Sequence, residues 1–128
     1  MTPRGLLRFG PISPAAAGPL YEQIVNAVKR EIAAGRLSPG EALPSVRALA
    51  TELLVSLITI KRAYEELERA GIIYSRQGLG TFVADNGAEE IRRARREQAR
   101  RAMAQAVRDG RAAGLSDKDL IDWLWKEL

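Results

Sequence analysis

Residues 56–62, SLITIKR, bring hydroxyl and cationic side chains together within two helical turns. On a helix that turns about 100° per residue, the apolar residues from 60 onward share one face. Ile58, Lys61 and Arg62 fall on the opposite face. Hydroxyl, ammonium and guanidinium groups in this arrangement can bind phosphates or the edges of bases. Two simpler interpretations stay open, in which Ser56 only caps the helix and Arg62 is only solvated.

The composition excludes the side chains that most often carry catalysis or bind metals. The 128 residues contain no cysteine and no histidine, which excludes thiol nucleophiles, imidazole bases and the usual zinc ligand sets. Disulfides are excluded as well, so nothing points to an oxidising compartment. No pair of carboxylates converges on a recognisable cleft. We therefore expect a protein that is not an enzyme and uses no cofactor or metal.

Charge and hydrophobicity narrow the class of partner. Twenty Lys and Arg stand against 16 Asp and Glu, and this net charge of +4 permits a polyanionic partner without requiring one. No apolar run approaches the ~20 residues that span a bilayer. Residues 1–18 are interrupted by Arg, Pro and Gly and make a poor signal peptide. The sequence therefore predicts a cytoplasmic protein without a membrane partner.

The first part of the chain reads as an irregular arm over residues 1–18, followed by a helix. We expect the helix to open at Pro19, because proline suits the first helical turn, and to stop at Gly35. Its apolar stripe recurs every four residues, at Leu20, Ile24, Val28 and Ile32.

Two further helices follow with almost no connection between them. Residues 36–45, RLSPGEALPS, are punctuated by Pro and Gly and predict a turn region. Ser45 can cap a short second helix, and Ser56 can cap a third that runs to Ala70. Only Leu54-Val55 separates these two helices, which favours a helix-turn-helix.

After Gly71 the hydrophobic period changes to that of strands. IIY, SRQGLG and TFVA predict two short strands joined by a glycine-containing turn. Three helices followed by a hairpin make a winged helix-turn-helix, which we assign to residues 19–85. The major groove of B-DNA admits one helix, and the wing can reach the backbone or the minor groove. A small fold without DNA-binding activity would have the same order of elements.

The C-terminal part, residues 88–128, reads as two helices. The first runs from Ala88 to about Arg108 and is interrupted by Asp109-Gly110 and by Gly114. Ser116 and Asp119 resemble a capping box at the start of the second. The overall fold class is therefore mainly α with a small β-hairpin.

Four segments in the right order and spacing resemble the GntR superfamily of bacterial transcription regulators. They are PLYEQI at 19–24, GRLSPGEALPSVRALA at 35–50, RAYEELERAGII at 62–73 and SRQGLGTFV at 75–83. The resemblance implies a sequence-specific regulator that binds double-stranded DNA. It implies DNA contacts at Arg47 and at residues 56–59 and 61. With the outer face of the third helix and the wing, the predicted DNA-binding residues are Ser45, Arg47, Ser56, Leu57, Ile58, Thr59, Lys61, Arg62, Arg76, Gln77 and Gly78.

The first turn of the third helix departs from the family pattern. Position 57 usually holds Arg or another polar residue, position 58 usually holds Asn or Thr, and Leu54 occupies a position that is commonly Gly. Ile58 points about 160° away from Ile60 and cannot share its core. It could contact thymine methyl groups, pack on another protein, or be exposed without a special role. Leu57 lies at the edge of the core stripe and could fold inward.

Two C-terminal helices and a short tail resemble the YtrA-type branch of this superfamily, whose C-terminal helices form a dimerisation module. Independently, a final helix of about eleven residues with two tryptophans needs a packing partner. We expect a homodimer that acts as a repressor on a palindromic operator; intrachain packing is the alternative. An effector would have to bind at the dimer interface or between the wing and the C-terminal helices. The predicted dimerisation residues are Met103, Ala106, Val107, Leu120, Ile121, Leu124, Trp125 and Leu128.

A function of another class is also compatible with the sequence. The same winged helix could be a protein-interaction module that docks through an apolar patch at Leu57 and Ile58.

Overall fold

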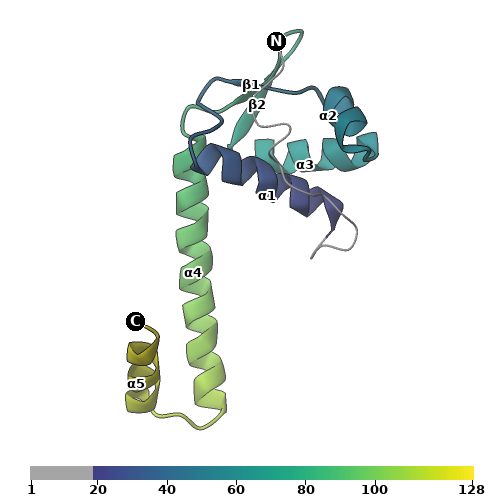
Figure 1. The fold of residues 1–128 in the computed structure, drawn as a ribbon. Helices are drawn as coiled ribbons and strands as arrows, with labels where there is room; N and C mark the ends of the chain where they lie inside the picture. Colours follow the sequence, from purple (N-terminus) through teal and green to yellow (C-terminus); the bar gives the residue numbers. More distant parts are fainter. Residues whose placement is uncertain (1–18) are drawn as a thin grey trace. The chain divides into compact units, whose positions relative to one another are not determined.

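The computed structural model describes residues 19–128, and its elements are mainly helical (Figure 1). The segment predicted as an irregular arm, 1–18, lies outside the described residues. In the described part the chain divides into two compact units between Arg92 and Arg93. The elements are α1 (Leu20–Ala33), β1 (Ala42–Leu43), α2 (Val46–Leu53), α3 (Leu57–Arg69), β2 (Ile73–Arg76), β3 (Gly80–Val83), α4 (Gly87–Ala112) and α5 (Asp117–Glu127).

The first helix begins one residue later than expected. Pro19 has extended backbone angles, φ −62° and ψ 154°, and is the N-cap of α1 rather than its first helical residue. Its carbonyl accepts the Gln23 N–H at 3.2 Å, which starts the helical hydrogen bonding. Gly35, with φ +79°, lies in the left-handed region just beyond the helix, at the stop that the sequence predicted.

The core of the first unit forms where α1 packs against α3 (Figure 1). The predicted stripe of α1 is buried from Ile24 to Ile32, and its partners on α3 are the predicted core residues of that helix. The buried set also takes in Ile72, Val83 and Ile91, so the sheet and the first turn of α4 close the same core. Glu31 is buried in α1, and its carboxylate forms an ion pair with Arg36 in the turn that follows.

The helix-turn-helix has the predicted caps and the predicted short turn. The Ser45 hydroxyl accepts the Ala48 N–H at 3.0 Å at the start of α2. Leu54 ends α2 in the left-handed conformation, with φ 56° and ψ 43°, and is the one described residue other than glycine with a positive φ. Because a left-handed leucine crowds its Cβ against the backbone, the turn stores strain at the position where relatives commonly carry Gly.

Among residues 19–128 the sheet has three strands, one more than the sequence predicted for this region. β2 and β3 form the expected antiparallel hairpin, with Ile73 opposite Val83. β1 pairs antiparallel with the other edge of β3, with Ala42 opposite Phe82, in the region that we expected to be a turn. A strand of two residues between Pro39-Gly40 and Pro44 is too short to show a hydrophobic period, so pattern analysis missed it.

The long C-terminal helix continues through the predicted interruption at Asp109-Gly110. α4 ends only after Ala112, and Gly110 is buried in it. A Cβ on Gly110 would lie 2.5 Å from Cδ2 of Leu120, so the glycine makes room for α5 rather than ending α4. Gly114, with φ +90°, lies in the turn, and the Ser116–Asp119 capping box that starts α5 is confirmed. None of the helices between residues 19 and 128 combines the length and the hydrophobicity of a membrane span.

Candidate nucleic-acid interface

The first turn of α3 carries two hydroxyls that bind each other. Ser56 caps α3 by accepting the Thr59 N–H at 3.2 Å, and its Oγ lies 2.8 Å from Thr59 Oγ1. The prediction that Ser56 caps this helix is confirmed. The mutual bond holds both hydroxyl rotamers in place at the exposed end of the helix.

Two aliphatic side chains project from the same turn. Ile58 is 79% exposed, which confirms that it lies outside the core stripe to which Ile60 belongs. Leu57 is 43% exposed, so it does not fold into the core either. Leu54, in the preceding turn, is 92% exposed. The start of α3 therefore presents exposed aliphatic side chains beside its two hydroxyls.

The outer face of α3 continues from Ile58 as a shallow hollow with mixed charge. Its lining residues are Ile58, Lys61, Arg62, Glu65, Glu66 and Arg69. Arg62 is held from α1, because its guanidinium carbon lies 3.9 Å from the ring centroid of Tyr21. Arg62 is exposed to solvent, and its side chain also contacts the ring of Tyr21. No sequence pattern singled out Tyr21 for this contact.

The start of α2 is tied to α3 by a buried hydrogen bond. The Tyr64 hydroxyl donates to the Pro44 carbonyl at 2.7 Å, and the burial of Tyr64 raises the pKa of its phenol above the ordinary range. Pro44 precedes Ser45, the N-cap of α2, and Arg47 is exposed in the first turn of that helix. The bond thus fixes the end of α2 that carries Arg47 relative to α3.

The wing tip is a tight turn between β2 and β3. Leu79 N–H donates to the Arg76 carbonyl at 2.9 Å, and Gly78 (φ +77°) and Gly80 (φ +119°) supply the left-handed conformations that the turn needs. Leu79 is 75% exposed at this tip, and sequence reasoning did not single it out. Its position between the two turn glycines could have indicated its exposure.

Aromatic side chains support the base of the wing. Tyr74 on β2 stacks on Phe82 on β3, with ring centroids 5.6 Å apart. The guanidinium carbon of Arg76 lies 5.3 Å from the centroid of Tyr74. Arg76 and Gln77 are exposed at the end of this support.

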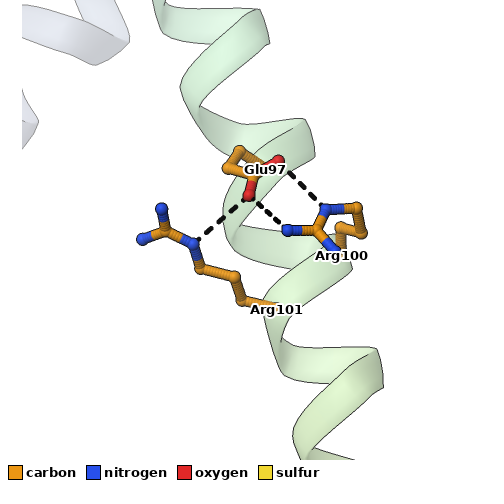
Figure 2. Close-up of polar contacts among 3 residues, drawn as sticks. All are labelled: Glu97, Arg100 and Arg101. Carbon is orange, nitrogen blue, oxygen red and sulfur yellow. Dashed lines mark hydrogen bonds and ion pairs between the residues drawn. The ribbon is translucent and has the colours of Figure 1, made fainter.

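In the second unit, the basic run of α4 contains one acidic residue. Glu97 accepts hydrogen bonds from Arg100 at 2.6 and 3.1 Å and from Arg101 at 3.3 Å (Figure 2). These bonds, that of Arg100 above all, lower the pKa of the Glu97 carboxyl. The exposed arginines outnumber this single carboxylate, so the run stays cationic between residues 91 and 101.

The predicted dimerisation residues form an apolar surface on α4 and α5. Leu120 packs within the chain over Gly110 and is only partly exposed. No residue of α5 is buried, and Trp123 and Trp125 are 58% and 69% exposed. The other large apolar residues exposed here are Met103, Val107, Ile121, Leu124 and Leu128. Within residues 19–128, nothing in the chain buries these side chains.

Residues 20–83, which contain α1, the helix-turn-helix and the wing, match the family described as bacterial regulatory proteins, gntR family. The chain belongs to the GntR family. It is 34% identical over 113 residues to the HTH-type transcriptional repressor YtrA of Bacillus subtilis, covering 88% of this chain and 87% of that protein. The resemblance to the YtrA-type branch is thereby confirmed, and the chain is a transcriptional regulator rather than an enzyme.

Solved structures of related proteins support the same fold and a DNA partner. A GntR family transcriptional regulator from Listeria monocytogenes is 34% identical, with a TM-score of 0.60, covering 86% of this chain and 96% of that one. The DNA-binding domain of AraR in complex with operator ORX1 is 34% identical, with a TM-score of 0.52, covering 56% of this chain and 89% of that one. The winged helix-turn-helix predicted from the sequence is confirmed.

Proposed function

We propose that this chain is a cytoplasmic transcriptional repressor that binds a palindromic operator as a homodimer. The observation that carries the proposal is the exposed outer face of α3, where Lys61 and Arg62 stand beside the capped first turn. Because the core-facing side of α3 is fully packed, this outer face is the part of the helix that can enter a major groove.

The residues of the interface divide by the contacts that they can make. Arg47, Lys61 and Arg62 provide the positive charge for phosphates, which sets affinity and register. Ser56, Leu57, Ile58 and Thr59 meet the base edges. The remaining predicted contacts are Ser45 at the start of α2 and Arg76, Gln77 and Gly78 at the wing tip.

Ile58 has a defined partner in this proposal. Apolar side chains read the C5-methyl group of thymine in the major groove. Ile58 is the exposed second residue of α3, and its aliphatic side chain favours such a contact over a hydrogen bond to guanine. The operator should therefore contain a thymine where the first turn of α3 enters each half-site.

Homodimerisation rests on the apolar surface of α4 and α5. Two half-exposed tryptophans and the exposed leucines beside them would aggregate or associate in water, and self-association through a two-fold axis removes this surface from solvent. In such a dimer the two-fold axis would place two copies of α3 on the two halves of a palindrome, about 34–36 Å apart.

In vitro selection from a library of 30-bp random duplexes tests the proposal, because it finds the operator without assuming its sequence. We expect enrichment of a palindrome, and a dissociation constant for it that rises steeply with salt concentration. Sedimentation equilibrium should give a dimer for the free chain. An unenriched library, or affinity that does not fall with salt, would refute sequence-specific DNA binding.

The exposed apolar turn also supports an alternative function. Leu54, Leu57 and Ile58 could form part of a docking patch for another protein. Ile58→Asn discriminates between the two functions, because it removes apolar surface and adds hydrogen-bonding groups. If this variant keeps the affinity and the operator preference of the wild type, Ile58 does not read DNA; if it also loses binding to a protein partner, protein docking becomes the better explanation.

A further inference from the structure

We propose that Tyr21 is a positioning residue for DNA binding, which holds the Arg62 guanidinium ready for a phosphate of the operator. This inference rests on the proposed function. It concerns a contact between α1, which precedes the helix-turn-helix, and α3, the second helix of that motif. Three features of Arg62 support it: the contact with Tyr21, the surrounding side chains and the position on α3.

The stacking geometry leaves the hydrogen-bonding capacity of Arg62 intact. Its guanidinium carbon lies 3.9 Å from the ring centroid, so the cation meets the face of the ring, where the π-electrons attract it. A guanidinium donates its five N–H groups within its own plane. The contact with the ring therefore orients the group, and within residues 19–128 its N–H groups form no hydrogen bond or ion pair, which leaves them available for bidentate binding of a phosphate.

Two carboxylates near Arg62 on α3 could form ion pairs with it but do not. Glu65 and Glu66 follow three and four residues later on α3, the spacings at which helical ion pairs form. Among residues 19–128, neither carboxylate forms an ion pair with Arg62. The ring of Tyr21 thus holds the side chain without neutralising its charge.

The place of Arg62 on α3 puts it on the face proposed to meet DNA. It lies four residues after Ile58 and lines the same hollow, one helical turn further from the capped start of α3. A long cationic side chain one turn after the residues that meet base edges can reach the phosphates that border the groove. Tyr21 itself stays anchored, because its ring packs against the core of the first unit.

A double-mutant cycle in DNA affinity tests the inference. We expect Arg62→Ala to weaken binding of the selected duplex roughly tenfold and to lower the slope of log K against log salt by about 0.9 per contact. Tyr21→Leu should weaken binding about two- to fivefold, the loss of one exposed cation–π contact. In the Arg62→Ala background, Tyr21→Leu should have no further effect, because the residue that Tyr21 positions is gone.

Two variants separate positioning from other roles of these residues. Tyr21→Phe keeps the ring face and should bind DNA as the wild type does; a loss equal to that of Tyr21→Leu would mean that the hydroxyl acts instead, and would overturn the inference. Arg69→Ala is the matched control, a cation in the same hollow about 10 Å further along α3. It should change neither the affinity nor the effect of Tyr21→Leu.

The same double-mutant cycle is also measured in the affinity for a scrambled duplex and in the temperature of thermal unfolding. A phosphate contact should show the same coupling on both duplexes, so the inference is tested even if selection finds no preferred sequence. Coupling in unfolding but not in DNA affinity, or additive effects on affinity, would overturn the inference alone. A wild type that binds neither duplex would refute the proposed function and the inference together.

Discussion

Removing the hydrogen bond from Tyr64 to the Pro44 carbonyl should measure how much this bond stabilises the helix-turn-helix. Tyr64→Phe keeps the buried ring and removes only the hydroxyl, 2.7 Å from a carbonyl in a buried residue. Leaving such a buried acceptor unpaired costs about 1–3 kcal/mol. For a domain of this size, a loss of about 2 kcal/mol corresponds to a fall in Tm of roughly 8–16 °C.

The pH dependence of the same variant gives a second signature. Because burial raises the pKa of Tyr64 in the folded state, the unfolded chain loses the phenolic proton first as the pH rises. The contribution of Tyr64 to the unfolding free energy of the wild type is fully present below about pH 10 and declines above it. The Phe variant has no such group, so the difference in unfolding free energy between the two proteins should narrow above about pH 10.

Urea denaturation followed by far-UV circular dichroism measures both effects. Tryptophan fluorescence is unsuitable, because both tryptophans lie in α5 and report on the second unit. Tyr74→Phe is the matched control, since Tyr74 is half-buried in the wing and contributes ring stacking rather than a buried hydroxyl bond. Equal losses of unfolding free energy in the two variants, or a loss below about 0.5 kcal/mol in Tyr64→Phe, would show that this hydrogen bond does not hold the helix-turn-helix together.

Three further predictions address the turn, the first residues of α3 and the dimer. Leu54→Gly should raise the unfolding free energy by up to about 1 kcal/mol, because relief of the left-handed strain outweighs the greater entropy of the unfolded chain; destabilisation in urea would contradict this. Ile58→Asn should change the sequence that in vitro selection enriches while leaving the salt slope unaltered, since no charge is lost. Leu124→Asp should convert the proposed dimer to a monomer in sedimentation equilibrium, whereas Lys118→Ala, also exposed on α5, should leave the proposed dimer intact.

Strong periodic patterns and caps were the features that sequence analysis predicted well. The stripe of α1, the core face of α3 and the caps at Ser45 and Ser56 each depend on residues close together in the chain. Local preference is enough to determine them.

The errors arose where distant residues decide the structure. Gly110 reads locally as a helix interruption, but the packing of Leu120 against it keeps it inside α4. β1 is a strand only because β3 is available to pair with it. The stacking of Arg62 on Tyr21 joins residues 41 positions apart, and no pattern within either helix predicts it.

The departure at Leu57 and Ile58 affects the proposed recognition of DNA unevenly. A bidentate arginine–guanine pair provides about 1–3 kcal/mol of discrimination against other bases, and a leucine at position 57 cannot form it. The phosphate contacts proposed for Arg47, Lys61 and Arg62 do not depend on that position. Affinity should therefore be largely retained, whereas discrimination at each half-site must come from the thymine methyl group, the Ser56 and Thr59 hydroxyls and DNA shape. Under this division, substitutions of the cations change the salt slope, and substitutions of the two aliphatic residues change the preferred sequence.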